Sequence, residues 1–159
     1  MDIAASIILP LLIALITAMV TSQIALRNFR KERMWELKVK SYDSIFEALF
    51  DFSEFFRKQI QTEILDNINV QELEDEKDRY NQASYYLGSV LFKGEFIILQ
   101  DAVNELEKLN KKLQVQEPGF WENLLTGHKR YKFYTAQKDV ISESTNRLRL
   151  IAKKDLGTR

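Results

Sequence analysis

The pattern of apolar and polar residues divides the chain after residue 26. Residues 3–26 contain no charged side chain and are mostly Ala, Val, Ile, Leu or Met. A helix over this range would be about 36 Å long, enough to cross the roughly 30 Å hydrocarbon core of a bilayer. The pattern therefore predicts a transmembrane helix, and Pro10 predicts a kink that a membrane helix tolerates.

Residues 3–26 have two other interpretations, a cleaved signal peptide and a buried core helix. A signal peptide begins with basic residues and ends in a small-residue cleavage site. This chain instead begins Met1-Asp2 and offers only a weak site at residues 21–25. A chain of this size rarely buries a long helix that is apolar on every side. We therefore expect an uncleaved anchor.

The apolar residues that follow the anchor recur every three or four positions, in a series that Ser53 interrupts once. They are Trp35, Val39, Tyr42, Phe46, Leu49, Phe56 and Ile60. This spacing places them on one face of a helix. No glycine or proline separates the stripe from the apolar run, so we expect one helix from about Ile3 to about Asp66. Trp35 begins the stripe and is expected to pack in the bundle rather than mark the membrane interface.

Further helices are predicted after residue 66. A second begins near residues 70–72, and two glycines in Gly88–Gly94 predict a kink or a break. Glu117-Pro118-Gly119 predicts a turn, and residues 120–125 predict a short helical turn. A last helix is expected from about His128 to Lys154, with Gly157 suited to its end.

The predicted fold class is therefore all-α. We expect an N-terminal transmembrane helix that continues into the long helix of an antiparallel bundle. The bundle has three helices if Gly88–Gly94 only kinks, and four if it breaks. The expected organisation is an anchor at residues 1–26, a helical body at 27–156 and a tail at 157–159.

Basic residues gather directly after the apolar run. They are Arg27, Arg30, Lys31, Arg33, Lys38 and Lys40. The positive-inside rule then predicts that Met1 lies outside and the body lies in the cytoplasm, with the anchor in the inner (cytoplasmic) membrane. The lack of cysteine fits a reducing compartment. The body is almost neutral, so we expect no nucleic-acid partner.

A second contact with the membrane is predicted from the helix order. If residues 70–115 form one helix that returns antiparallel to the first, residues 118–128 lie near the inner leaflet. Aromatic and basic residues there suit a membrane interface. Alternatively, the aromatic residues cap the core and the basic residues are solvated, and a break at Gly94 would redirect the chain. The complete set of predicted membrane-interface residues is Arg27, Arg30, Lys31, Arg33, Phe120, Trp121, Lys129 and Arg130.

An acidic cluster lies at the start of the second predicted helix. It consists of Glu72, Glu74, Asp75, Glu76 and Asp78. It could dock a basic partner or a divalent cation, but it lacks the glycine-bearing pattern of a calcium loop. Acidic residues are favoured in the first turn of any helix by the helix dipole. We therefore expect an ordinary solvated helix start.

The sequence offers few residues for catalysis. It has no cysteine and one histidine, His128, and it lacks the glycine-rich motifs that bind phosphate or dinucleotides. Nucleophilic catalysis requires a nucleophile beside an oriented base. We therefore predict no catalytic, cofactor-binding or metal-ligating residues, and an enzyme of unfamiliar type is the least favoured hypothesis.

Residues 30–38 read Arg-Lys-Glu-Arg-Met-Trp-Glu-Leu-Lys and are followed by Tyr42. Together with the anchor and the helical body, this segment resembles a loose class of small, mostly uncharacterised bacterial single-pass membrane proteins. The resemblance implies an accessory or effector component of a defence or stress system. We expect a non-enzymatic interaction module with membrane lipid and a protein partner or further copies of itself. The alternative is a membrane-tethered sensor or adaptor whose bundle binds a protein or a small ligand.

Overall fold

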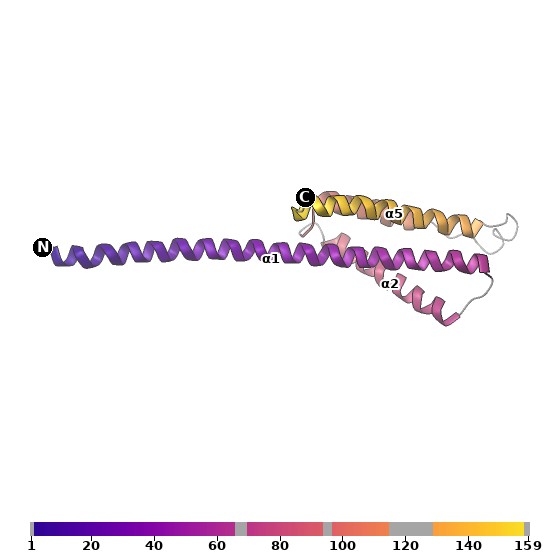
Figure 1. Ribbon diagram of the computed structural model, residues 1–159, viewed down its shortest axis with the longest axis horizontal. Helices are drawn as coiled ribbons and strands as arrows, with labels where there is room; N and C mark the ends of the chain where they lie inside the picture. Colours follow the sequence, from indigo (N-terminus) through magenta and orange to yellow (C-terminus); the bar gives the residue numbers. More distant parts are fainter. Residues whose placement is uncertain (1, 66–69, 94–96, 115–128, 158–159) are drawn as a thin grey trace. The chain divides into compact units, whose positions relative to one another are not determined.

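The protein is all-α in the part that the computed structural model describes, residues 2–65, 70–93, 97–114 and 129–157. No strand occurs among these residues. The helices are α1 (Asp2–Leu65), α2 (Val70–Lys93), α3 (Gln100–Leu113) and α5 (Lys129–Leu156), as Figure 1 shows.

The chain divides into two compact units, Met1–Leu37 and Lys38–Arg159, and α1 runs through both. The boundary expected after residue 26 marks where charged residues begin. The structural division instead falls where α1 begins to pack against other helices. The two units are therefore described separately.

In the second unit, α5 runs antiparallel to α1. Lys38 of α1 pairs with Asp155 near the end of α5, whereas Glu63 pairs with Arg130 near its start. α2 is also antiparallel to α1, because Lys58 pairs with Glu76 near the start of α2. Figure 1 shows α2 and α5 beside this part of α1.

α3 runs antiparallel to α5, so the described helices of the second unit alternate in direction along the chain. The amide of Leu99, which precedes α3, donates to Asp155, and Gln137 donates to the carbonyl of Lys112 near the end of α3. This alternation is the up-down pattern of an antiparallel bundle.

Apolar residues from all the described helices form one core in the second unit. α1 contributes Tyr42, Ile45, Leu49, Phe52 and Phe56, each at most 4% exposed. An aromatic cluster joins three helices, since the ring of Tyr80 lies 4.9 Å from Phe52 and 5.9 Å from Phe56, and Phe56 lies 6.2 Å from Tyr134. Aromatic pairs at these distances add stability beyond the area that they bury.

The helix predictions are confirmed at most boundaries. One helix spans the apolar run and the first stripe, and α2 begins at Val70. α2 continues through Gly88 and ends at Lys93, so the described part contains four helical segments rather than three. Gly157 adopts a left-handed φ of 70° directly after α5, where a residue without a Cβ ends a helix at low cost.

The expectation for Trp35 is wrong. Its side chain is 51% exposed and it belongs to the first unit. The three-to-four spacing continues across the boundary, but Lys38 is where packing against other helices begins. The turn expected at residues 117–119 and the helical turn at 120–125 lie outside the described residues.

Candidate functional site: an apolar segment, two buried carboxylates and a groove

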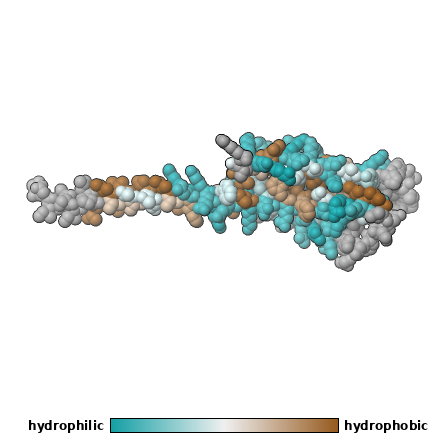
Figure 2. All heavy atoms as spheres, in the orientation of Figure 1, coloured by the Kyte–Doolittle hydropathy of each residue, from teal (hydrophilic) through white to brown (hydrophobic). Residues whose placement is uncertain are grey.

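The apolar segment of α1 presents its side chains to the surroundings on every side. Large apolar residues from Leu11 to Leu26 are between 50% and 63% exposed. Figure 2 shows mostly hydrophobic residues, with paler patches between them, on the visible face of this part. In the described residues, α1 is the one helix long and apolar enough to cross a membrane, and none of its apolar window is buried. Such a surface is stable in lipid or inside a protein, but not in water.

The two threonine hydroxyl groups within this segment are satisfied inside the helix. Thr17 donates to the carbonyl of Ile13 and Thr21 donates to the carbonyl of Thr17, both at 2.8 Å. A polar group without a partner is costly in hydrocarbon, and bonding to the carbonyl four residues earlier removes that cost. Both threonines are therefore compatible with an apolar solvent.

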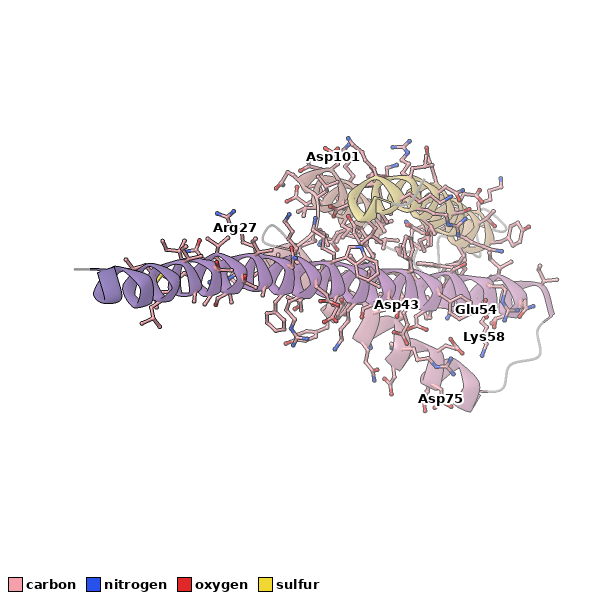
Figure 3. The ribbon with its side chains drawn as sticks, turned by 60° about the vertical axis from the view of Figure 1, so that its left-hand side comes forward. Arg27, Asp43, Glu54, Lys58, Asp75 and Asp101 are labelled. Atoms are coloured by element: carbon pink, nitrogen blue, oxygen red, sulfur yellow. The ribbon has the colours of Figure 1, made fainter. Side chains whose placement is uncertain are left out.

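The basic residues that follow the apolar segment are exposed. Arg27, Arg30, Lys31 and Arg33 all lie on α1, where Figure 2 shows the visible surface changing from hydrophobic to hydrophilic. Arg33 pairs with Glu36 at 3.1 Å, and both side chains are more than half exposed. Arg27 extends away from the helix in Figure 3.

The helices of the second unit do not follow the path on which the predicted second membrane contact depends. α2 and α3 are separate helices that run antiparallel. The end of α3 at Leu113 therefore lies near Gln137 of α5 and not beside Lys38. Arg130 accordingly lies 4.0 Å from Glu63, near the end of α1. The condition for that return, a single helix over residues 70–115, is not met, because α2 ends at Lys93 and α3 begins at Gln100. Lys129 is exposed, and Phe120 and Trp121 lie outside the described residues.

Asp155 joins three helices at one end of the bundle. Its carboxylate accepts hydrogen bonds from Lys38 Nζ at 2.5 Å, from the hydroxyl of Tyr42 at 3.0 Å and from the amide of Leu99 at 3.1 Å. The side chain is only 4% exposed. Leu99 precedes α3 and has no side-chain cap of its own, so Asp155 supplies an acceptor for an amide at that helix start.

Burial and the hydrogen bond to Asp155 raise the pKa of Tyr42 well above its usual range, and the negative charge of Asp155 adds to this effect. The phenol therefore remains protonated and donates to the carboxylate. Sequence reasoning missed Asp155, although a signal was present. Asp155 lies seven residues after buried Leu148 and three residues after buried Ala152, which places it on the buried face of α5.

Glu76 is a second buried carboxylate, between α1 and α2. It is 2% exposed, and its Oε1 lies 2.7 Å from Lys58 and 3.4 Å from Arg79. Figure 3 shows Lys58 on the part of α1 near α2. The expectation of a solvated helix start is therefore wrong for Glu76, while Glu74, Asp75 and Asp78 are exposed as expected.

The position of Glu76 also had a signal in the sequence. It precedes Tyr80 by four residues and so continues the stripe of Tyr80, Ala83 and Leu87. Its Oε2 is buried and has no hydrogen-bond partner in the described structure. Desolvation of a buried ion pair offsets much of its attraction, so the pairing of Glu76 with Lys58 is weak evidence for a net gain in stability.

A small polar cavity lies further along the same pair of helices. It has a volume of about 220 Å³ and is lined by Ser44, Glu47, Asp51, Gln82 and Tyr86, among others. Burial raises the pKa of the Asp51 carboxyl, partly offset by the nearby charge of Arg79. Within the described ranges, no group of three or more His, Cys, Asp or Glu side chains is placed to hold a metal ion.

A larger groove of about 500 Å³ lies between α1 and α5. Its α1 wall includes Phe46, Leu49 and Phe50, and its α5 wall includes Asn146 and Arg149. Sequence reasoning did not single out this groove, because it depends on which faces of two distant helices meet.

No protein family model, curated protein or solved structure matches the chain.

Proposed function

We propose that the chain is a single-pass protein of the bacterial inner membrane that holds a helical interaction unit at the cytoplasmic face. The observation that carries this proposal is the apolar segment of α1, whose large side chains from Leu11 to Leu26 are at least half exposed. Its two threonine hydroxyls are bonded within the helix. Lipid is the environment that suits both features.

The orientation is proposed from charge. Exposed basic residues at 27–33 border one end of the segment, and the other end has none. The positive-inside rule then places Met1 outside and the helical unit in the cytoplasm. These basic residues would also attract anionic lipid at the inner leaflet.

The proposed action is non-enzymatic assembly of copies within the membrane, as an accessory or effector component of a defence or stress system. The exposed face of α2 supports it, because Tyr85 and Phe92 are 83% and 85% exposed. They lie on one side of the helix with Gly88 between them, and the space beside Gly88 is open. A membrane anchor gives copies one orientation and raises their effective concentration.

Membrane insertion and orientation are tested on the full chain. We expect it to remain in membranes after an alkaline carbonate wash. A cysteine introduced at residue 159 should react with a membrane-impermeant maleimide only after the cells are opened, since the natural chain has no cysteine. Release by carbonate would contradict the anchor, and labelling of intact cells would contradict the orientation.

Assembly is tested separately by crosslinking in membranes. Tyr85→Cys should form crosslinked dimers, whereas Glu107→Cys, at an exposed site on α3, should not. Monomers alone under all conditions would contradict assembly without contradicting the anchor.

The second candidate function is a membrane-tethered sensor or adaptor. The groove between α1 and α5 favours it, because its volume falls within the range of small-molecule sites. Replacing the anchor by another transmembrane segment distinguishes the two functions. A sensor should still bind its ligand or partner after the replacement. An effector that depends on contacts within its own anchor should lose its effect on cells.

A further inference from the structure

We infer that the groove between α1 and α5 binds a small molecule that has an aromatic ring and one anionic group. The groove lies entirely within the second unit and has a volume of about 500 Å³. The inference does not depend on the proposed membrane anchor or on assembly.

The two walls of the groove differ in chemistry. Phe46 and Phe50 lie one helical turn apart on α1, and both line the groove. Phe50 is 62% exposed, and Leu49 and Ile141, each 1% exposed, lie deeper. Two neighbouring phenyl rings over an apolar floor favour a flat aromatic ring, which can stack on them.

The α5 wall carries polar groups one turn apart. Ser142, Asn146 and Arg149 line the groove and are exposed. In the described part of the chain, none of the three side chains has a hydrogen bond or an ion pair. Their donors and acceptors are therefore free to bind a ligand.

The charge of the groove indicates that the ligand carries an anionic group in addition to its ring. Among the described residues that line the groove, Arg149 alone is charged, so these residues carry one positive charge. A guanidinium group binds a carboxylate through two parallel hydrogen bonds. A ligand with its ring on Phe46 and Phe50 and its anion on Arg149 would satisfy both walls.

Binding is tested with 2-naphthoate as the probe and the full chain in detergent micelles, by equilibrium dialysis against empty micelles. We expect 2-naphthamide, which lacks the charge, and acetate, which lacks the ring, to bind at least about tenfold more weakly, since a hydrogen bond to a charged group has about this effect or more. Equal binding of all three probes, or no binding of 2-naphthoate at millimolar concentration, would overturn the inference.

Two substitutions at exposed positions test the contributions of the two walls of the groove separately. Arg149→Gln should weaken 2-naphthoate binding by about tenfold and should leave 2-naphthamide binding unchanged. Phe50→Ala should weaken both aromatic probes by about fivefold. The matched controls are Lys154→Gln and Leu150→Ala, exposed positions on α5 that do not line the groove. Controls that weaken binding as much as Arg149→Gln and Phe50→Ala would overturn the inference.

Single-cysteine labelling locates the bound probe. Because the chain has no cysteine, Asn146→Cys provides one reactive thiol in the groove and Leu150→Cys provides one outside it. We expect 2-naphthoate to slow maleimide labelling at residue 146 at least about threefold and to leave labelling at residue 150 unchanged. Equal protection at both sites would overturn the inference. Disulfide-linked dimers at residue 146 that resist 2-naphthoate would overturn it in favour of a second copy in the groove.

Discussion

Two parts of α1 use apolar residues in opposite ways. Between Leu11 and Leu26 the large apolar side chains cover all sides and are at least half exposed. From Tyr42 to Phe56 the core-forming side chains occupy one face and are nearly fully buried. The second part is stabilised by its own protein neighbours, whereas the first is exposed and is long and apolar enough to cross a membrane. Substitutions in the two parts should therefore have separable effects.

The largest expected effect is in the core of the second unit. Phe52→Ala should lower the free energy of unfolding by about 3–5 kcal/mol, because it leaves a cavity beside Tyr80. Phe50→Ala, two residues earlier and 62% exposed, should change it by less than about 0.5 kcal/mol. Urea unfolding of the full chain in detergent micelles, followed by circular dichroism, measures both. Equal effects would contradict the assignment of the buried face.

The apolar segment should respond to charge rather than to cavity formation. Leu15→Arg should disfavour membrane insertion by about 3 kcal/mol and move protein out of the carbonate-resistant fraction. The urea midpoint of the second unit should not change. Leu150→Arg, at an exposed position on α5, is the matched control and should remain in the membrane fraction. Unchanged fractionation of the Leu15→Arg variant would contradict the anchor.

The Asp155 cluster should be intermediate in effect. Asp155→Ala leaves Lys38, the Tyr42 hydroxyl and the Leu99 amide without their acceptor. We expect the free energy of unfolding to fall by about 2–3 kcal/mol. This is less than for a fully buried ion pair, because the Lys38 side chain is 29% exposed. Asp139→Ala, at an exposed position on the same helix, should cost less than about 0.5 kcal/mol. Equal unfolding midpoints for the two variants would contradict the structural role of Asp155.

The same cluster predicts a pH dependence at the alkaline end. The pKa of Tyr42 is raised in the folded state, first by burial and then by Asp155. Above pH of about 10 the unfolded tyrosine loses its proton while the folded one keeps it, so the unfolded state binds fewer protons and stability falls as the pH rises. The slope from one such group is at most about 1.4 kcal/mol per pH unit.

Tyr42→Phe should therefore make the alkaline loss of stability less steep. Some loss should remain, because burial also raises the pKa of Tyr80. Tyr85→Phe, at a site 83% exposed, is the control and should leave the slope unchanged. Urea unfolding between pH 9 and pH 11 gives the slope for each variant, and identical slopes for Tyr42→Phe and wild type would contradict this assignment.

The smallest expected effect is a gain in stability at Gly88. This glycine lies inside α2, and a Cβ placed there would meet nothing within 4 Å. Gly88→Ala should stabilise the second unit by up to about 1 kcal/mol, since alanine has the higher helix propensity. The urea midpoint measures the gain. A lower midpoint would indicate that Gly88 is needed for a contact that the isolated chain does not make, and would support assembly through this face of α2.

The amino-acid sequence alone was sufficient for the features that depend on neighbouring residues. The apolar run, the continuity of α1 past residue 26, the start of α2 at Val70 and the end of α5 before Gly157 all follow from local periodicity, helix breakers and caps. These features can be predicted because they are decided within a few turns of one helix.

Only the tertiary structure decided which residues meet. The break after Lys93 reverses α3, and this reversal brings Arg130 to Glu63 and removes the geometric premise for a second membrane contact. The burial of Glu76 and Asp155, and the groove beside Arg149, likewise depend on helices that are distant in sequence. The helical period of the sequence shows on which face of its helix a charged residue lies. The partner that makes burial of that charge possible comes from another part of the chain, and so does the second wall of the groove.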